Sequence, residues 1–187
     1  ISDDFALNDK SKNKNNSKKT ILFQLDNLAS KNDFLKARAE SDSSALKKKF
    51  SNEEIYKKNL PINSSCKNLY SIAEKIRYES LGGKMLKGIE KNFQDNYNQM
   101  INFKRKDQLN TKDDVSVSEA FELYMLKKFH NIKLNSLTNK MLNFWEKDFD
   151  SSIEKHINYL KNNLENQEKY ASKFSEILQS MEIFQHE

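Results

Sequence analysis

An apolar stripe that repeats in steps of four and three residues runs through the last part of the chain. Its members are Ile153, Ile157, Leu160, Leu164, Gln167, Ala171, Phe174, Leu178 and Met181. Such steps keep side chains on one face of an α-helix, which turns once every ~3.6 residues. We therefore predict one long helix from about residue 152 to 184 that packs against another helix. Because Gln167 and Ala171 weaken the seam, we expect it to pack inside a domain rather than in a free-standing dimer.

The composition of the chain also favours helices. Its 187 residues include only three Gly and one Pro, and 36% are apolar. Sheets and long loops use more turn residues than this, whereas long helices with one wet face need few. We predict an all-α fold of about six or seven helices, built around two long antiparallel amphipathic helices.

The polar character of the chain changes near residue 20. Residues 1–19 are rich in Lys and Asn without periodicity, which predicts a flexible polar arm. Residues 20–187 form the predicted helical domain. Residues 21–25 are the one candidate for a short N-terminal strand, since they are a short apolar run. Because the chain begins at Ile1, we expect a piece of a longer protein.

Two weakly periodic helices are predicted before the single proline, over residues 33–40 and 43–58, and the pair Leu60-Pro61 ends the second. The predicted inward residues are Ala45, Leu46, Phe50, Ile55 and Tyr56.

The next two predicted helices meet at Gly82-Gly83. The run Asn63-Ser64-Ser65 offers an N-cap for a helix that ends at Leu81, where the glycines supply a C-terminal cap. A second helix follows, joined to the first as a hairpin or across a kink. Its predicted apolar face comprises Met85, Leu86, Ile89, Phe93, Tyr97 and Met100.

A capping box and an aromatic cluster mark the following helices. Ser116 or Ser118 is predicted to cap the next helix, with a capping-box pattern from Ser116 to Glu119, and the cluster is centred on Trp145. Trp145 is interpreted as a core residue whose indole N–H bonds to a helix end, in preference to an anchor for a partner protein. Residues 150–152 are predicted to cap the long final helix.

The charge distribution gives little support to nucleic-acid binding. The net charge is +5, but the only arginines are Arg38, Arg77 and Arg105. Base readout and bidentate phosphate contacts rely on Arg. The basic run at residues 104–106 is interpreted as a solvated loop, with a phosphate- or acid-binding patch as the alternative.

No constellation of residues points to catalysis or metal binding, and we predict no catalytic, cofactor-binding or metal-binding residue. Cys66 is expected to be a small half-buried side chain, and His130, His156 and His186 to lie at the surface or at helix ends. No nucleotide-binding glycine motif, membrane-spanning run or signal peptide is apparent, so the predicted compartment is the cytosol.

Several blocks of residues, in order, resemble a known family. They are residues 42–48 (Asp-Ser-Ser-Ala-Leu-Lys-Lys), 72–82 (Ile-Ala-Glu-Lys-Ile-Arg-Tyr-Glu-Ser-Leu-Gly), 118–123 (Ser-Glu-Ala-Phe-Glu-Leu), 141–149 (Met-Leu-Asn-Phe-Trp-Glu-Lys-Asp-Phe), 164–174 and 177–182. The chain resembles, over about residues 42–184, the amino-terminal region of the T subunit of aerobic cobaltochelatase. Residues 1–41 are shorter and more polar than that family leads us to expect.

The resemblance implies a helical adaptor in cobalamin biosynthesis. It implies two partners, a ring-forming AAA+ ATPase subunit and a large chelatase subunit, in a complex that uses ATP and magnesium to insert cobalt into hydrogenobyrinic acid a,c-diamide. None of the family's nucleotide, metal or tetrapyrrole sites maps onto this chain. Two alternatives stay open: an adaptor of a related AAA+ and von Willebrand A system outside cobalt insertion, and a general helical scaffold.

Overall fold

The computed structural model describes residues 30–102, 109 and 111–181, and every regular element in that part of the chain is helical. The α-helices are α2 (Lys31–Phe50), α3 (Glu53–Lys58), α4 (Ser64–Met85), α5 (Lys87–Asn102), α6 (Val117–Phe129), α7 (Ser136–Asn143), α8 (Glu146–Ile153), α9 (Ile157–Asn162) and α10 (Gln167–Ser180). Two single-turn 3₁₀ helices lie at Lys112–Asp114 and Glu154–His156. The predicted all-α class is confirmed. The predicted arm at residues 1–19, the possible strand at residues 21–25 and the basic run at residues 104–106 lie outside the described residues.

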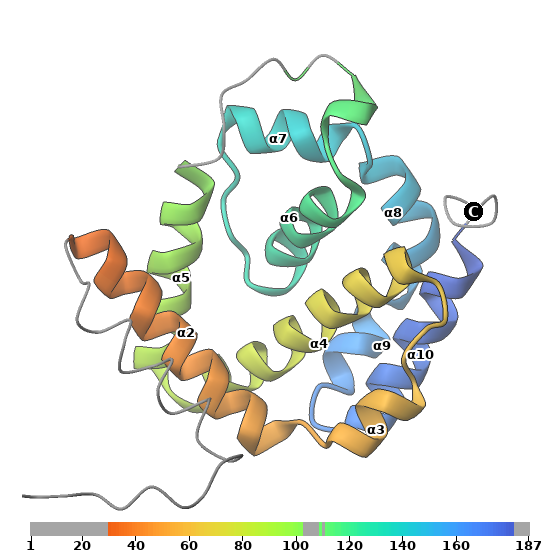
Figure 1. Ribbon diagram of the computed structural model, residues 1–187, viewed down its shortest axis with the longest axis horizontal. Coiled ribbons are helices and arrows are strands. Elements are labelled where there is room, and N and C mark those ends of the chain that lie inside the picture. Colours follow the sequence, from red (N-terminus) through yellow and green to blue (C-terminus); the bar gives the residue numbers. More distant parts are fainter. Residues whose placement is uncertain (1–29, 103–108, 110, 182–187) are drawn as a thin grey trace, which may run out of the picture.

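Helix α4 is the centre of the fold. It packs against α2 and α5 along part of its surface and against α6 and α10 along the rest, and Figure 1 shows these helices gathered around it. Eleven of its 22 residues are buried. Because four helices cover α4, little of its surface is exposed to solvent. Some of its charged residues are therefore buried.

Two predicted helix starts are confirmed, and among the candidate caps the structure selects Asn63 and Ser116. The Asn63 side chain accepts hydrogen bonds from the backbone N–H groups of Ser65 and Cys66. The Ser116 side chain accepts one from the N–H of Glu119. Each satisfies donors that the first turn of a helix leaves without a partner.

The prediction that Gly82-Gly83 ends a helix is wrong, because α4 continues through both glycines to Met85. A Cβ atom at Gly82 would lie only 2.3 Å from Cδ1 of Leu46 on α2. Glycine is therefore required there for the close approach of two helices rather than for a left-handed cap. The chain turns instead at Leu86, and both Met85 and Leu86 are exposed, against expectation.

The prediction of one long helix over residues 152–184 is also wrong. The segment is divided into α8, a 3₁₀ turn, α9 and α10, with a break at residues 163–166. The side chain of Asn166 caps α10 by accepting from the N–H of Lys169, and Asn163 bonds back to the carbonyl of Tyr159. Asparagine side chains compete for backbone bonds in this way and stop helices. The prediction that residues 150–152 cap a helix is wrong, because all three lie within α8.

The burial predicted for the apolar stripe is nevertheless confirmed. Every member, from Ile153 to Met181, is buried. The stripe reflects packing onto the same core by three successive helices. The two longest helices are α2 and α4, and they pack against each other.

Helix α2 is one continuous helix where two were predicted. It runs unbroken from Lys31 to Phe50, and Ser51-Asn52 separates it from α3. Leu46 is buried as predicted, Phe50, Ile55 and Tyr56 are half-buried, and Ala45 is exposed, contrary to prediction.

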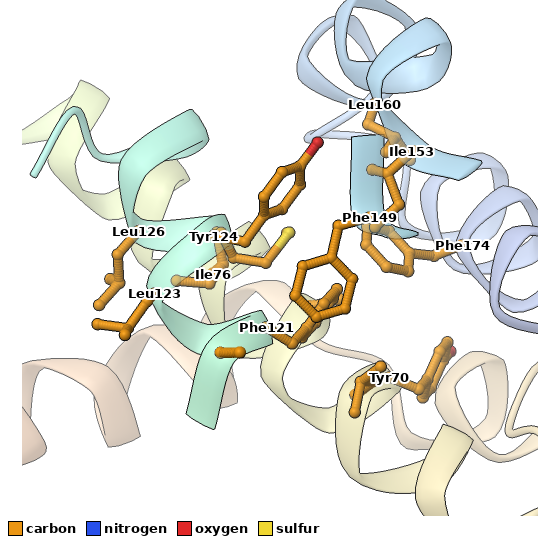
Figure 2. Close-up of a cluster of buried hydrophobic side chains, with 14 of the residues drawn as sticks. Tyr70, Ile76, Phe121, Leu123, Tyr124, Leu126, Phe149, Ile153, Leu160 and Phe174 are labelled. Atoms are coloured by element: carbon orange, nitrogen blue, oxygen red, sulfur yellow. The ribbon is translucent and has the colours of Figure 1, made fainter. Parts of the chain in front are cut away.

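An aromatic cluster forms the core between α4, α6, α8 and α10 (Figure 2). The rings of Phe149 and Phe174 both meet Phe121 edge to face, with centroids 5.6 and 6.0 Å away. All three side chains are fully buried. This geometry is the favoured one for aromatic pairs and adds about 0.5–1.5 kcal/mol per pair to their hydrophobic burial.

Candidate functional site

A buried arginine lies at the centre of a polar network that joins three segments of the chain. Arg77 on α4 is fully buried, and its guanidinium contacts both carboxylate oxygens of Glu74, at 2.8 Å each. It also donates to the backbone carbonyls of Leu164 (2.8 Å) and Phe50 (2.6 Å). A planar guanidinium supplies five donors, so one side chain can join three segments of chain.

The partner carboxylate extends this network. Glu74 also accepts hydrogen bonds from Ser51 (2.7 Å) and Gln167 (2.9 Å). Gln167 in turn bonds both the N–H and the carbonyl of Asn52. The network therefore fixes the junction of α2 and α3 against the start of α10, and Gln167 serves as a buried link rather than as a weak position in a seam.

A second buried carboxylate joins α2, α4 and α5. Glu79 accepts hydrogen bonds from Ser43 on α2 (2.6 Å) and from Tyr97 on α5 (2.5 Å). Burial raises the pKa of Glu79, while the charge of Lys75 and the two hydrogen bonds lower it in part. Burial, together with the neighbouring Glu79 charge, raises the pKa of Tyr97 well above its usual range.

His130 adds a titratable group next to this second cluster. It ends α6, as predicted for a helix-end histidine, and its ring lies 5.8 Å from that of Tyr97. Its Nε2 atom is buried and has no hydrogen-bond partner among the described residues. Burial, helped by the charge of Lys75, lowers the pKa of His130 to about 4.

The other candidate residues are dispersed. Cys66 lies in the first turn of α4 and is more deeply buried than predicted, with its thiol 3.7 Å from the carbonyl of Leu178. His156 lies at the 3₁₀ turn before α9 and is half-buried, and His186 lies outside the described residues. No group of three or more His, Cys, Asp or Glu residues within residues 30–102, 109 and 111–181 could hold a metal ion.

Trp145 makes the hydrogen bond predicted for it, although its side chain is half-buried against the core rather than inside it. Its indole N–H donates to the carbonyl of Val115, the residue that ends the 3₁₀ turn Lys112–Asp114 (3.0 Å). One face of the ring stacks on Phe149, and the ammonium of Lys112 lies 4.1 Å from the ring centroid. The side chain thus ties the connection before α6 to α8.

A groove of about 1260 Å³ runs along one side of α2. Helices α3, α4 and α5 complete its walls, and its apolar lining includes Phe34, Ala37, Tyr56, Leu60 and Phe93. The buried residues Glu74 and Glu79 also line it. Arg38, Lys47 and Lys48 lie in its walls and are exposed.

Sequence reasoning missed the buried charges of α4, although a signal was present. Tyr70, Glu74, Arg77 and Leu81 follow one another in steps of four and three, so they share one helix face next to the stripe through Leu69, Ala73 and Ile76. Two opposite charges between apolar residues at that spacing indicate a buried ion pair. All four residues are buried.

The fold and these contacts define an all-helical domain in which buried polar groups bind to one another and hold helices together. None of the described helices is long and apolar enough to cross a membrane. The family model of cobalamin biosynthesis protein CobT matches residues 5–187, so the chain belongs to the CobT family. No solved structure matches the chain.

Proposed function

We propose that this chain is a non-catalytic adaptor domain of an ATP-dependent cobaltochelatase, and that it acts in the cytosol between an AAA+ ATPase subunit and a large chelatase subunit. The observation that carries the proposal is the match of the CobT family model to nearly the whole chain. In this proposal the partners supply the sites for ATP, magnesium and the tetrapyrrole. Cobalt is the substrate of the complex.

The contacts of α4 support a role in transmitting position or force. Helix α4 packs against α2, α5, α6 and α10, and the Arg77 network links it by hydrogen bonds to the C-terminal end of α2 and to the start of α10. A domain joined in this way moves as one body, because packed interiors resist deformation. Such a body can couple a motor subunit to a catalytic subunit without holding a catalyst itself.

Reconstitution tests the proposal. The protein that contains this chain is mixed with the ATPase and large subunits of cobaltochelatase, and cobalt insertion is measured with each component omitted in turn. We expect sedimentation to show a complex of the three components. We also expect cobalt insertion to be lost when the protein is omitted. We also expect no ATP hydrolysis by the protein alone.

Two results would contradict the proposal. Cobalt insertion at an unchanged rate without the protein would remove the adaptor role. Binding to the ATPase without any binding to the large subunit would favour an adaptor of a related AAA+ system that acts on another target.

A further inference from the structure

The groove beside α2 extends along most of that helix. Phe34 in the first turn and Lys48 in the last turn both line it, and the helix rises by about 21 Å between them. The volume of the groove, about 1260 Å³, exceeds the ~300–1,000 Å³ of ordinary small-molecule pockets. A groove of this length and size suits a segment of polypeptide better than a compact small molecule.

The apolar part of the lining is incompletely covered by the described helices. Phe34 is 49% exposed, and Ala37 lies about one turn further along the same face of α2. Tyr56 on α3 and Leu60 just beyond it add half-buried apolar surface. Helix α2 buries three of its 20 residues, whereas α10 buries seven of its 14. Because packing of an apolar face is what mainly stabilises a helix in water, α2 still has surface on which another helix can pack.

Each carboxylate that lines the groove has a partner within the described chain. Both oxygens of Glu74 are bound by Arg77, and both oxygens of Glu79 accept hydrogen bonds, from Ser43 and Tyr97. The more exposed carboxylates are also paired, in the ion pairs Glu53–Lys57 (2.7 Å) and Glu40–Lys36 (3.9 Å) and in a hydrogen bond from Asn92 to Asp42 (2.6 Å). These carboxylates are therefore already occupied by groups of the same chain.

Most of the cations that line the groove, by contrast, make no ion pair with any described residue. These unpaired cations are Arg38, Lys47, Lys48 and Lys75. The first three are exposed, whereas Lys75 is half-buried, with its ammonium 5.6 Å from the centre of the Tyr97 ring. The groove therefore combines an apolar lining with positive charge that the described chain does not neutralise.

We propose that this groove is the docking site for an amphipathic helix of a partner protein, with apolar residues on one face and Asp or Glu beside them. Such a helix packs its apolar face on Phe34, Ala37 and Leu60, in the way that amphipathic helices bind in apolar grooves. Its carboxylates then meet the unpaired cations, and this complementarity of charge selects the partner. The inference rests on the proposed function only for the protein that supplies the helix, which is one of the subunits with which the chain assembles.

Two designed helical peptides provide the first test, which needs no other subunit. Both have about 14 residues, the length that spans the groove, and one face of leucines. One peptide carries Glu beside that face, and the other carries Lys at the same positions. Each is labelled and titrated into the protein, and binding is followed by fluorescence anisotropy. We expect the acidic peptide to bind at least about tenfold more tightly than the basic one, by a margin that shrinks as salt is added.

Charge reversal shows whether the peptide binds in the groove. The double variant Arg38→Glu, Lys48→Glu reverses two cations of the groove, whereas Lys67→Glu, Lys155→Glu reverses two exposed cations outside it and gives the same net charge. We expect the first double variant to bind the acidic peptide at least about tenfold more weakly than the second, while circular dichroism shows both to be folded. Equal binding by the two double variants, or no binding of the acidic peptide to the unaltered protein, would overturn the proposal.

A crosslink in the assembled complex tests the partner. A photoreactive amino acid replaces Ala37 in the groove or, as the control, Ala45 on an exposed part of α2 outside it. Each protein is mixed with the ATPase and large chelatase subunits and irradiated, and the crosslinked segments are identified by mass spectrometry. We expect position 37 alone to crosslink, and to do so with an acidic helical segment of one subunit.

The outcomes separate this inference from the proposed function. If the complex assembles and position 37 crosslinks no more than position 45, the docking inference is wrong and the proposed function stands. A crosslink between two copies of this chain would make the groove an interface between copies and would also overturn the inference. If no complex assembles, the proposed function fails, and the peptide titrations still decide whether the groove binds an acidic helix.

Discussion

Helices α2 and α10 both pack on α4, but they are held there by different interactions. Helix α10 contributes large apolar side chains, among them Tyr170, Phe174 and Leu178. Helix α2 contributes few, and is attached by hydrogen bonds from Ser43 to Glu79 and from Asn92 on α5 to Asp42. The Phe50 carbonyl at its end is bound by Arg77.

This difference shows how one central helix can be covered in two ways. The hydrophobic effect, which has no direction of its own, contributes most to holding α10, and hydrogen bonds from Gln167 to Glu74 and from Tyr170 to the Ala73 carbonyl orient it. Hydrogen bonds to buried charges contribute less net free energy, because the charged groups lose hydration, but they specify one geometry. Variants on the two sides of α4 should therefore respond differently.

The largest expected effect is at the point where the two sides meet. Arg77→Met removes the guanidinium and leaves the buried Glu74 carboxylate without its counter-charge. We expect a loss of about 3–5 kcal/mol in the free energy of unfolding, measured by urea denaturation. The double variant Arg77→Met, Glu74→Gln should recover part of that loss, since the uncompensated charge is removed. A double variant as unstable as the single one would show that packing, not charge, decides the effect.

Removal of a buried aromatic side chain of α10 should lower the free energy of unfolding nearly as much as Arg77→Met does. Phe174→Ala deletes a fully buried ring that contacts Phe121 and Tyr170, with an expected cost of about 3–5 kcal/mol. Tyr159→Ala on α9 is the matched control, because that ring is 45% exposed, and its cost should stay below about 1 kcal/mol. Equal losses in the free energy of unfolding for the two variants would show that α10 is not held mainly by its buried aromatic side chains.

The cluster on the other side of α4 should make stability depend on pH. Folding lowers the pKa of His130 from 6.5 to about 4, so the unfolded chain binds a proton in this range that the folded chain does not. Stability from this group is complete above pH 6.5 and is lost as pH falls towards 4, by at most about 3 kcal/mol.

The raised pKa of Glu79 acts in the opposite direction, because the folded chain then retains a proton that the unfolded chain releases. Comparing the free energy of unfolding of His130→Gln with that of the unaltered protein isolates the contribution of the histidine. As the pH falls from 6.5 to 4, we expect the unaltered protein to lose more stability than the variant. Parallel stability curves for the two proteins would exclude a histidine contribution.

The contact between α2 and α4 should give the smallest effect. Gly82→Ala places a Cβ against the buried Leu46, with an expected cost of about 1–3 kcal/mol, partly offset by the higher helix propensity of Ala. Gly88→Ala in α5 is the control, because its Cβ would meet nothing within 4 Å, and it should stabilise by about 0.4–1 kcal/mol. The additional change Leu46→Ala should relieve the cost of Gly82→Ala if the clash is its cause.

Part of the site could be predicted from the sequence because its signals are local. The helix starts at Asn63 and Ser116 are predictable because these side chains accept hydrogen bonds from N–H groups of the first helical turn. The hydrogen bond of Trp145 is predictable because an indole N–H that packs against the core needs an acceptor. Glu74 and Arg77 were missed because their burial depends on Leu164 and Phe50, which are distant in the sequence. The groove was missed for the same reason, since four helices form it.

The sequence by itself determined the helical class, several helix starts, the membership of the CobT family and the burial of the stripe from Ile153 to Met181. These features depend on composition, spacing and contacts within a few residues. Only the tertiary structure decided that the stripe is divided among three helices, that Gly82 lies inside α4, and that Arg77 joins α2, α4 and the start of α10. The physical reason is that the spacing of apolar residues specifies which of them share a helix face. Where a helix ends, and how closely two helices approach, depends on the other parts of the chain that pack against that face.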